Sequence, residues 1–215
     1  MKITLVCTNV AHPVNAYLQS WMDEQQGVHE VELVRNKTEL EGGQILFLVS
    51  CSEIIGQVDR NKYLATLVLH ASDLPKGRGW SPHIWEIVNG ADHITLSLLE
   101  AEDKVDSGRI WAKKQIDVPA HALWDEINHL LFMAEIELID LAVKNFGRLT
   151  PQLQTDVAQA TYYPKRTPQN SQLDPYKTIA DQFNQMRVCD PNRFPAFFVH
   201  LGQRYTVKLE KTNES

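Results

Sequence analysis

The stretch GGQILFLVSC, residues 42–51, decides the fold class. Two glycines open it, and an unbroken apolar run follows from Ile45 to Val49. Such a run, without alternation of polar residues, is typical of a parallel strand covered on both faces. Short apolar runs of the same kind occupy residues 2–7, 30–34 and 65–70. Helix-length segments separate these runs. The pattern predicts an α/β fold with a mostly parallel sheet flanked by helices.

The rest of the chain divides near residue 150. The first part, 1–150, is the predicted main domain, and the second, 151–215, is an extension with a helix and a β-hairpin. The segment 162–178 has three prolines and mostly polar residues, which indicate an exposed connection. The further predicted elements are a helix within 12–26, a helix at 81–90 beginning with Ser81-Pro82, strands at 93–100 and 108–118, a long amphipathic helix at 121–147, a helix at 177–188 and a hairpin at 196–211.

Composition excludes several classes of function. The net charge of −6 argues against a general nucleic-acid binder, which would carry a basic excess. The chain has no signal-peptide pattern and no apolar run long enough to span a bilayer, so we expect no membrane association and a cytoplasmic location. Three widely spaced cysteines make no disulfide framework, and no close pair of histidines indicates a metal site.

One strand of the predicted sheet ends in a histidine. In LVLHASDLPKGRGWSP, residues 67–82, His70 closes the apolar run, and Asp106 follows the strand at 93–100 within an acidic loop. Ligands of open α/β sheets bind outside the carboxyl ends of the strands, so both residues are expected at one edge. A carboxylate that orients an imidazole makes an acid–base unit. The alternative is a strand-end histidine satisfied by backbone, with an aspartate in an ordinary turn.

The loop after His70 also has two interpretations. Glycines allow close backbone approach while Lys76 and Arg78 contact a phosphate, or the loop is a solvated turn. Trp80 can stack on an aromatic ligand. Cys51 stands at a strand end without an adjacent histidine, which favours a packing thiol over a nucleophile. The segment HPVN, 12–15, lacks the glycines of a dinucleotide site, so NAD is not expected.

These motifs resemble a known family. HASDLPKGRGWSPHIW followed by KVDSGRIW is similar to the formyltransferases that use N10-formyltetrahydrofolate, whose pattern is Asn-x-His-x-Ser-x-Leu-Pro, Arg-Gly-x-x-Pro and Asp-(Ser/Thr)-Gly. The resemblance covers residues 1–145. YYPKRTPQNSQLD, 162–174, is similar to a segment of the nucleotide-sugar members. The matching residues are His70, Ser72, Leu74, Pro75, Arg78, Gly79, Pro82, Asp106, Ser107 and Gly108.

The resemblance implies a Rossmann-like catalytic domain and a role for each site residue. His70 would stabilise the oxyanion, and Asp106 would orient and charge it. The co-substrate N10-formyltetrahydrofolate would lie between two walls, formed by Ser50, Cys51 and Ile54 on one side and by Leu99, Glu100 and Val105 on the other. The residues expected to contact the acceptor substrate are Ser72, Lys76, Arg78 and Trp80. Ser72 would also support the histidine loop.

One position departs from the family pattern. The asparagine expected two residues before the histidine is Val68 here, and its amide would share the oxyanion hydrogen bond. Loss of one such donor costs roughly 100- to 1,000-fold in rate. Asn89 and His83 are the possible substitutes.

The implied function is formyl transfer to the amine of a nucleotide-linked amino sugar in bacterial surface-glycan synthesis, such as the pseudaminic-type pathways. Methionyl-tRNA and glycinamide ribonucleotide are alternative acceptors, and a non-catalytic folate- or nucleotide-binding protein is an alternative of another class. The hairpin carries Phe197, Phe198 and Val199, which either pack on the main domain or form a homodimer contact.

Overall fold

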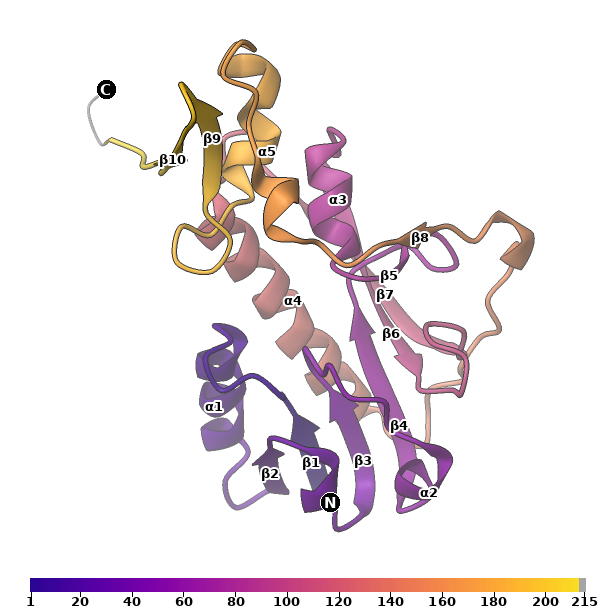
Figure 1. The fold of residues 1–215 in the computed structure, drawn as a ribbon. Coiled ribbons are helices and arrows are strands. Elements are labelled where there is room, and N and C mark those ends of the chain that lie inside the picture. Colours follow the sequence, from indigo (N-terminus) through magenta and orange to yellow (C-terminus); the bar gives the residue numbers. More distant parts are fainter. Residues whose placement is uncertain (213–215) are drawn as a thin grey trace.

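The computed structural model describes residues 1–212 and contains one main sheet of six strands in the order β2-β1-β3-β4-β6-β7. Figure 1 shows this sheet with helices beside it. The predicted strands are all present. Their bounds are β1 Lys2–Val6, β2 Glu30–Val34, β3 Gly43–Leu48, β4 Tyr63–His70, β6 His93–Glu100 and β7 Ile110–Asp117.

The sheet is mixed. The first four strands are parallel, whereas β6 runs antiparallel to β4 and β7 antiparallel to β6. In the register, His70 lies opposite Ser97, and Glu100 at the end of β6 lies opposite Leu67. The expectation that β4 and the strand at 93–100 end at the same edge is therefore wrong. Periodicity does not distinguish a buried antiparallel strand from a parallel one.

The long helix α4, Trp124–Lys144, covers one face of the sheet together with α1, Val14–Glu24. Every third or fourth residue of α4 is buried, as its amphipathic sequence predicts. Each fully buried leucine or isoleucine on such a face contributes about 1.5–3 kcal/mol. The buried side chains of α4 include Ile127, Leu131, Leu138 and Ile139.

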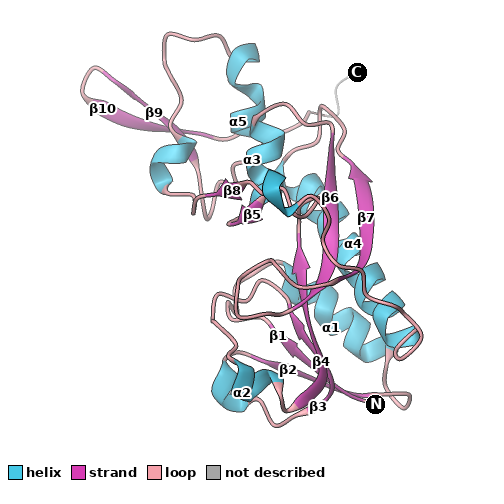
Figure 2. Cartoon of the chain, turned by 90° about the vertical axis from the view of Figure 1, so that its right-hand side faces the viewer, coloured by secondary structure: helices cyan, strands magenta, loops and turns pink. Residues whose placement is uncertain are grey.

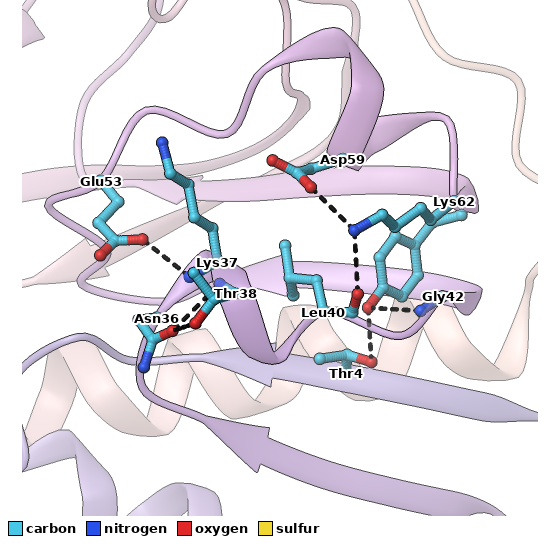
Figure 3. A network of polar contacts seen from close by, with 10 residues as sticks. Thr4, Asn36, Lys37, Thr38, Leu40, Gly42, Glu53, Asp59 and Lys62 are labelled. Carbon is cyan, nitrogen blue, oxygen red and sulfur yellow. Dashed lines mark hydrogen bonds and ion pairs between the residues drawn. The ribbon is translucent and has the colours of Figure 1, made fainter.

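The other face of the sheet has a smaller cover. Here a second apolar cluster, which includes Leu40 and Tyr63, packs beneath loops and the short helix α2, Gln57–Arg60. The Tyr63 hydroxyl donates to Thr4 Oγ1 at 3.1 Å and accepts from the Gly42 amide at 3.2 Å. Figure 3 shows this polar network, in which Lys62 also bonds the Leu40 carbonyl.

The remaining elements lie beyond the sheet. The predicted hairpin is present and projects from the rest of the chain (Figure 2). The helix expected at 177–188 is shorter: a 3₁₀ turn at Ala180–Gln182 precedes α5, Phe183–Arg187. The other bounds are β5 Arg78–Gly79, α3 Pro82–Val88, β8 Tyr162–Tyr163, β9 Ala196–His200 and β10 Gln203–Val207.

Two kinds of feature are absent from residues 1–212. No helix in 1–212 combines the length and the apolar character that crossing a bilayer requires. The same residues contain no group of three histidine, cysteine or acidic side chains arranged to hold a metal ion.

Candidate active site

A cleft of about 720 Å³ opens where His70 ends β4. Its walls come from parts of the chain that are distant in sequence: the loops that follow β1, β3 and β4, the loop between β6 and β7, one face of α4, and residues after 160. A cavity therefore lies at the strand end where a ligand site is predicted, and residues of the extension line part of it.

His70 and Asp106 meet in this cleft. His70 Nδ1 lies 3.5 Å from Asp106 Oδ1, and both side chains are more than nine-tenths buried. His70 Nε2 lies 2.9 Å from the Gly77 carbonyl, which can only accept, so this nitrogen carries a hydrogen. Both ring nitrogens thus face protein oxygens. The imidazole is thereby held between two oxygens, in a position from which it can act on a developing oxyanion.

The loop 101–109 brings Asp106 to this position, although β6 ends at Glu100, opposite Leu67 and not at the His70 end of β4. Asp106 has a left-handed backbone, with φ of 56°, which aspartate adopts more readily than most residues. Its second carboxylate oxygen accepts from the Gly79 amide at 2.9 Å. At Gly108 a Cβ would stand 1.9 Å from the Glu100 carbonyl, so the tight return of this loop requires glycine. The predicted Asp-Ser-Gly motif therefore has a steric basis.

The predicted folate walls line the cleft with one exception. Ser50, Cys51 and Ile54 contribute from the loop after β3, and Glu100 and Val105 from the opposite loop. Ile54 is 70% exposed and Val105 is 55% exposed, so each loop offers an aliphatic surface that a flat ring would cover. The exception is Leu99, which is fully buried in the sheet opposite Val68 and does not reach the cleft.

Other residues brace these two walls. The Arg60 guanidinium donates to the Ile55 carbonyl at 2.8 Å and pairs with Asp103 at 2.6 Å, so it joins one loop to the other. Glu53 accepts from the Lys37 amide at 2.8 Å, as Figure 3 shows. The Glu100 carboxylate is itself paired with Arg109 at 2.7 Å. The walls are therefore fixed from outside the cleft.

Three of the four predicted acceptor contacts lie outside the cleft, and only Trp80 lines it. Arg78 is 1% exposed because its guanidinium is bonded inside the protein, so it cannot meet a phosphate as expected. Lys76 is exposed and does not line the cleft. Ser72 is fully buried, and its carbonyl accepts from Ser97 Oγ at 2.7 Å, which agrees with a supporting role for the loop.

The position of the missing asparagine faces the cleft. The Val68 side chain lines it and supplies no donor. Of the two possible substitutes, His83 lines the cleft and Asn89 does not. His83 Nδ1 is buried without a hydrogen-bond partner in the described chain. Burial, with His70 and Arg166 nearby, lowers the pKa of His83 to about 3, so its ring is neutral.

Two titratable groups that sequence reasoning missed also line the cleft. Burial, with a contribution from Arg193, lowers the pKa of His12 to about 4. Burial alone raises the pKa of Glu135 to about 8, and its Oε2 has no partner among residues 1–212. Glu135 had a visible signal: it stands on the apolar stripe of the long helix, four residues after Leu131 and four before Ile139.

Cations from the extension line the same cleft. Lys165 Nζ lies 4.7 Å from the centre of the Trp80 ring, and the Arg166 guanidinium 5.9 Å from that of Trp85. Arg193 is the third. In the part of the chain that the structure describes, none of these three cations forms an ion pair with a carboxylate. They are available to an anionic ligand.

Comparison with known proteins reveals the fold. No protein-family model matches the chain. A methionyl-tRNA formyltransferase from Clostridium thermocellum superposes with a TM-score of 0.81 at 22% identity, over 95% of this chain and 90% of that one. A sugar N-formyltransferase from Shewanella sp. gives a TM-score of 0.74 at 14% identity, over 100% of this chain and 99% of that one. The chain has the formyltransferase fold.

A third formyltransferase-fold neighbour was solved with a folate. HypX from Aquifex aeolicus, in complex with tetrahydrofolic acid, gives a TM-score of 0.76 at 21% identity. The match covers 95% of this chain and 36% of HypX. At such identities the likeness concerns architecture, and the chemistry of this chain depends on its own residues.

Proposed function

We propose that the protein moves a formyl group from N10-formyltetrahydrofolate to the amine of a nucleotide-linked amino sugar. The observation that carries this proposal is the buried His70–Asp106 pair in the cleft of a formyltransferase fold. A donor of this class agrees with the aliphatic side chains of Ile54 and Val105 on the two braced walls. It also agrees with the folate complex of a neighbour with this fold.

The reaction follows from the site. The neutral acceptor amine attacks the formyl carbon, a carbon–nitrogen bond forms, and the carbonyl oxygen becomes an oxyanion. His70, charged beside Asp106, donates to that oxygen; its Nε2 hydrogen, now held by Gly77, is shared with it. The attacking nitrogen then loses a proton, the bond between carbon and N10 breaks, and N10 takes a proton as tetrahydrofolate leaves. His83 is the proposed second donor in place of the family asparagine.

A nucleotide-linked acceptor is favoured by the unpaired cations of the cleft. Lys165, Arg166 and Arg193 can meet a diphosphate, and the exposed face of Trp80 can stack on a base. These residues replace Lys76 and Arg78 in the proposal. The net charge of −6 disfavours an extended RNA contact, which argues against methionyl-tRNA.

The wider setting is part of the same proposal. Formylated amino sugars of this kind belong to bacterial surface glycans such as lipopolysaccharide, and the co-substrates imply a cytoplasmic location. A homodimer also remains a prediction. On the hairpin, Phe197 is 4% exposed and packs inside, whereas Val199 is 43% exposed and is available for a contact. Light scattering at two protein concentrations tests it.

Turnover tests the proposal directly. The protein is incubated with N10-formyltetrahydrofolate and, in separate reactions, a panel of nucleotide-linked amino sugars, methionyl-tRNA and glycinamide ribonucleotide. Release of tetrahydrofolate and the mass of the formylated product are followed. We expect transfer to at least one nucleotide-linked amino sugar. Transfer only to the RNA or the ribonucleotide, or folate binding without transfer to any amine, would overturn the proposal.

A further inference from the structure

The segment 152–163, called the strap here, crosses both loops that hold the His70–Asp106 pair. At one end, Gln152 and Ile110 exchange two backbone hydrogen bonds of 2.8 Å. At the other end, β8 pairs in parallel with β5, in the histidine loop. A Cβ on Gly79 would lie 2.4 Å from the Tyr163 carbonyl, so the two backbones approach as closely as glycine allows. The strap lies beyond the boundary predicted at residue 150.

Gln154 joins the two loops through its side chain. Its Nε2 donates to the Asp106 carbonyl and to the Gly108 carbonyl, both at 2.9 Å. Its Oε1 accepts from Arg78 Nη2 at 2.7 Å. Arginine can only donate and carbonyls can only accept, so these partners fix the orientation of the amide. One side chain therefore ties the aspartate loop to the histidine loop.

Arg78 anchors this connection from the buried side. It is 1% exposed, and its other terminal nitrogen donates to the Tyr162 hydroxyl at 3.2 Å. Within residues 1–212 it forms no ion pair with a carboxylate, so the oxygen of Gln154 is one of its two side-chain acceptors. A buried guanidinium needs such partners because its desolvation is costly.

The strap also fixes the other partner of His70. Thr161 Oγ1 accepts from the Gly77 amide at 2.8 Å, and the carbonyl of Gly77 is the group that accepts from His70 Nε2. Both oxygens that face the imidazole, one from Gly77 and one from Asp106, are thus held by residues of the strap. Asp106 needs such support because its left-handed backbone is strained for a residue other than glycine.

We infer that Gln154 is a positioning residue, which holds the backbone of Asp106 so that its carboxylate stays against His70. The inference rests on the proposed function for its kinetic readout. Misplacement of a reacting group by about 1 Å can cost roughly 100-fold in rate. Loss of Gln154 therefore reduces kcat and leaves the folate walls, which are braced separately by Arg60, in place.

Two substitutions at Gln154 separate positioning from packing. Gln154→Glu keeps an acceptor for Arg78 but loses both donors to the aspartate loop, and Gln154→Leu loses all three bonds. Gln159→Leu is the matched control, since this glutamine is an exposed strap residue without a side-chain hydrogen bond in the described structure. We expect both Gln154 variants to lose roughly 10- to 100-fold in kcat, with the tetrahydrofolate Kd within about twofold of wild type and the control unchanged.

A measurement without turnover completes the test. The ring-nitrogen resonances of His70, observed by NMR in the protein bound to tetrahydrofolate, should move in both Gln154 variants and not in Gln159→Leu. An inactive wild type would overturn the proposed function, and the resonances would still test Gln154. Recovery of wild-type kcat and resonances in Gln154→Glu would overturn the inference, because the residue would then serve only Arg78. Parallel loss of folate affinity and rate would overturn it too.

Discussion

The two sides of the cleft are built differently. On the proposed folate side, the loops after β3 and β6 present backbone, aliphatic and acidic groups, and Arg60 and the Lys37 amide bond these loops from outside the cleft. The other side presents titratable and cationic side chains from α4 and the extension, among them Glu135 and Lys165, whose polar ends have little protein support. The first side has the form of a rigid slot, which suits a co-substrate that is always the same. The second side has polar groups without protein partners, which suits a ligand that supplies the missing hydrogen-bond or ion-pair partners.

A large effect is expected where the two sides meet. In Asp106→Asn the amide oxygen can still accept from Gly79, but the nitrogen then faces His70 Nδ1 as a donor, and the ring loses support for its charged form. We expect kcat to fall roughly 100- to 1,000-fold. Steady-state kinetics and tetrahydrofolate titration check this. An unchanged kcat would contradict the role of the pair.

The next effect concerns the stability of the fold and the carboxyl group of Glu135, which lies on the second side of the cleft. The pKa of Glu135 rises from its usual 4.5 to about 8 through burial, so the folded state holds the proton more tightly than the unfolded state. The contribution of Glu135 to the free energy of unfolding should fall as pH rises from about 5 to 8, by a few kcal/mol. Glu86, with a pKa raised to about 7, contributes in the same direction, and His12 and His83, with lowered pKa values, in the opposite one. Urea unfolding of wild type and Glu135→Gln at several pH values isolates the Glu135 contribution as the difference between the two, with the exposed Glu24→Gln as control; the same pH dependence in Glu135→Gln and wild type would contradict the assignment.

A smaller effect should appear in acceptor binding alone. Lys165→Ala combined with Arg166→Ala removes two unpaired cations, and we expect the KM for a nucleotide-linked acceptor to rise about 10- to 30-fold, from hydrogen bonds to charged groups. The KM for the folate should not change. Kinetics at two salt concentrations check this, with Lys37→Ala, a lysine outside the cleft, as control. Equal changes in both KM values would erase the distinction between the two sides.

The smallest effect is expected from removal of Arg60, which links the two loops of the proposed folate side. Arg60→Ala removes the link between the folate walls, but its partner Asp103 is largely exposed, and such ion pairs contribute less than about 1 kcal/mol. We expect the tetrahydrofolate Kd to rise about two- to fivefold, measured by calorimetry, with the acceptor KM unchanged. A larger rise in the acceptor KM than in the folate Kd would show that the walls are not independent.

The sequence was informative where structure follows local pattern. The apolar run at 45–49, the stripe of α4 and the hairpin near Gly202 all appear as expected, because burial and turn chemistry determine them. The sequence also predicts the proximity of His70 and Asp106, although β6 is antiparallel to β4 and not parallel as expected. The loop that actually brings them together depends on Asp106 in the left-handed region and on Gly108 at a close approach.

Other features depend on contacts between distant segments, which a single sequence does not show. Arg78 looked like a phosphate ligand because arginine in a glycine loop often is one, yet Gln154 and Tyr162, some eighty residues later, bury it. Leu99 lies opposite Val68 on the same face of the sheet, but it is fully buried and does not reach the cleft. The sequence shows Glu135 as a carboxyl group on an apolar stripe, but only the structure shows that this carboxyl group lines the cleft.

The central claim is that the His70–Asp106 pair performs formyl transfer, and that the cleft binds folate whether or not this pair is intact. Its most direct test is His70→Ala, measured for tetrahydrofolate affinity and for transfer to a nucleotide-linked amino sugar. We predict a Kd within about threefold of wild type, because the walls are braced elsewhere, and a loss of roughly 1,000- to 10,000-fold in transfer rate. A variant that binds folate and still transfers formyl at a near wild-type rate would contradict the account.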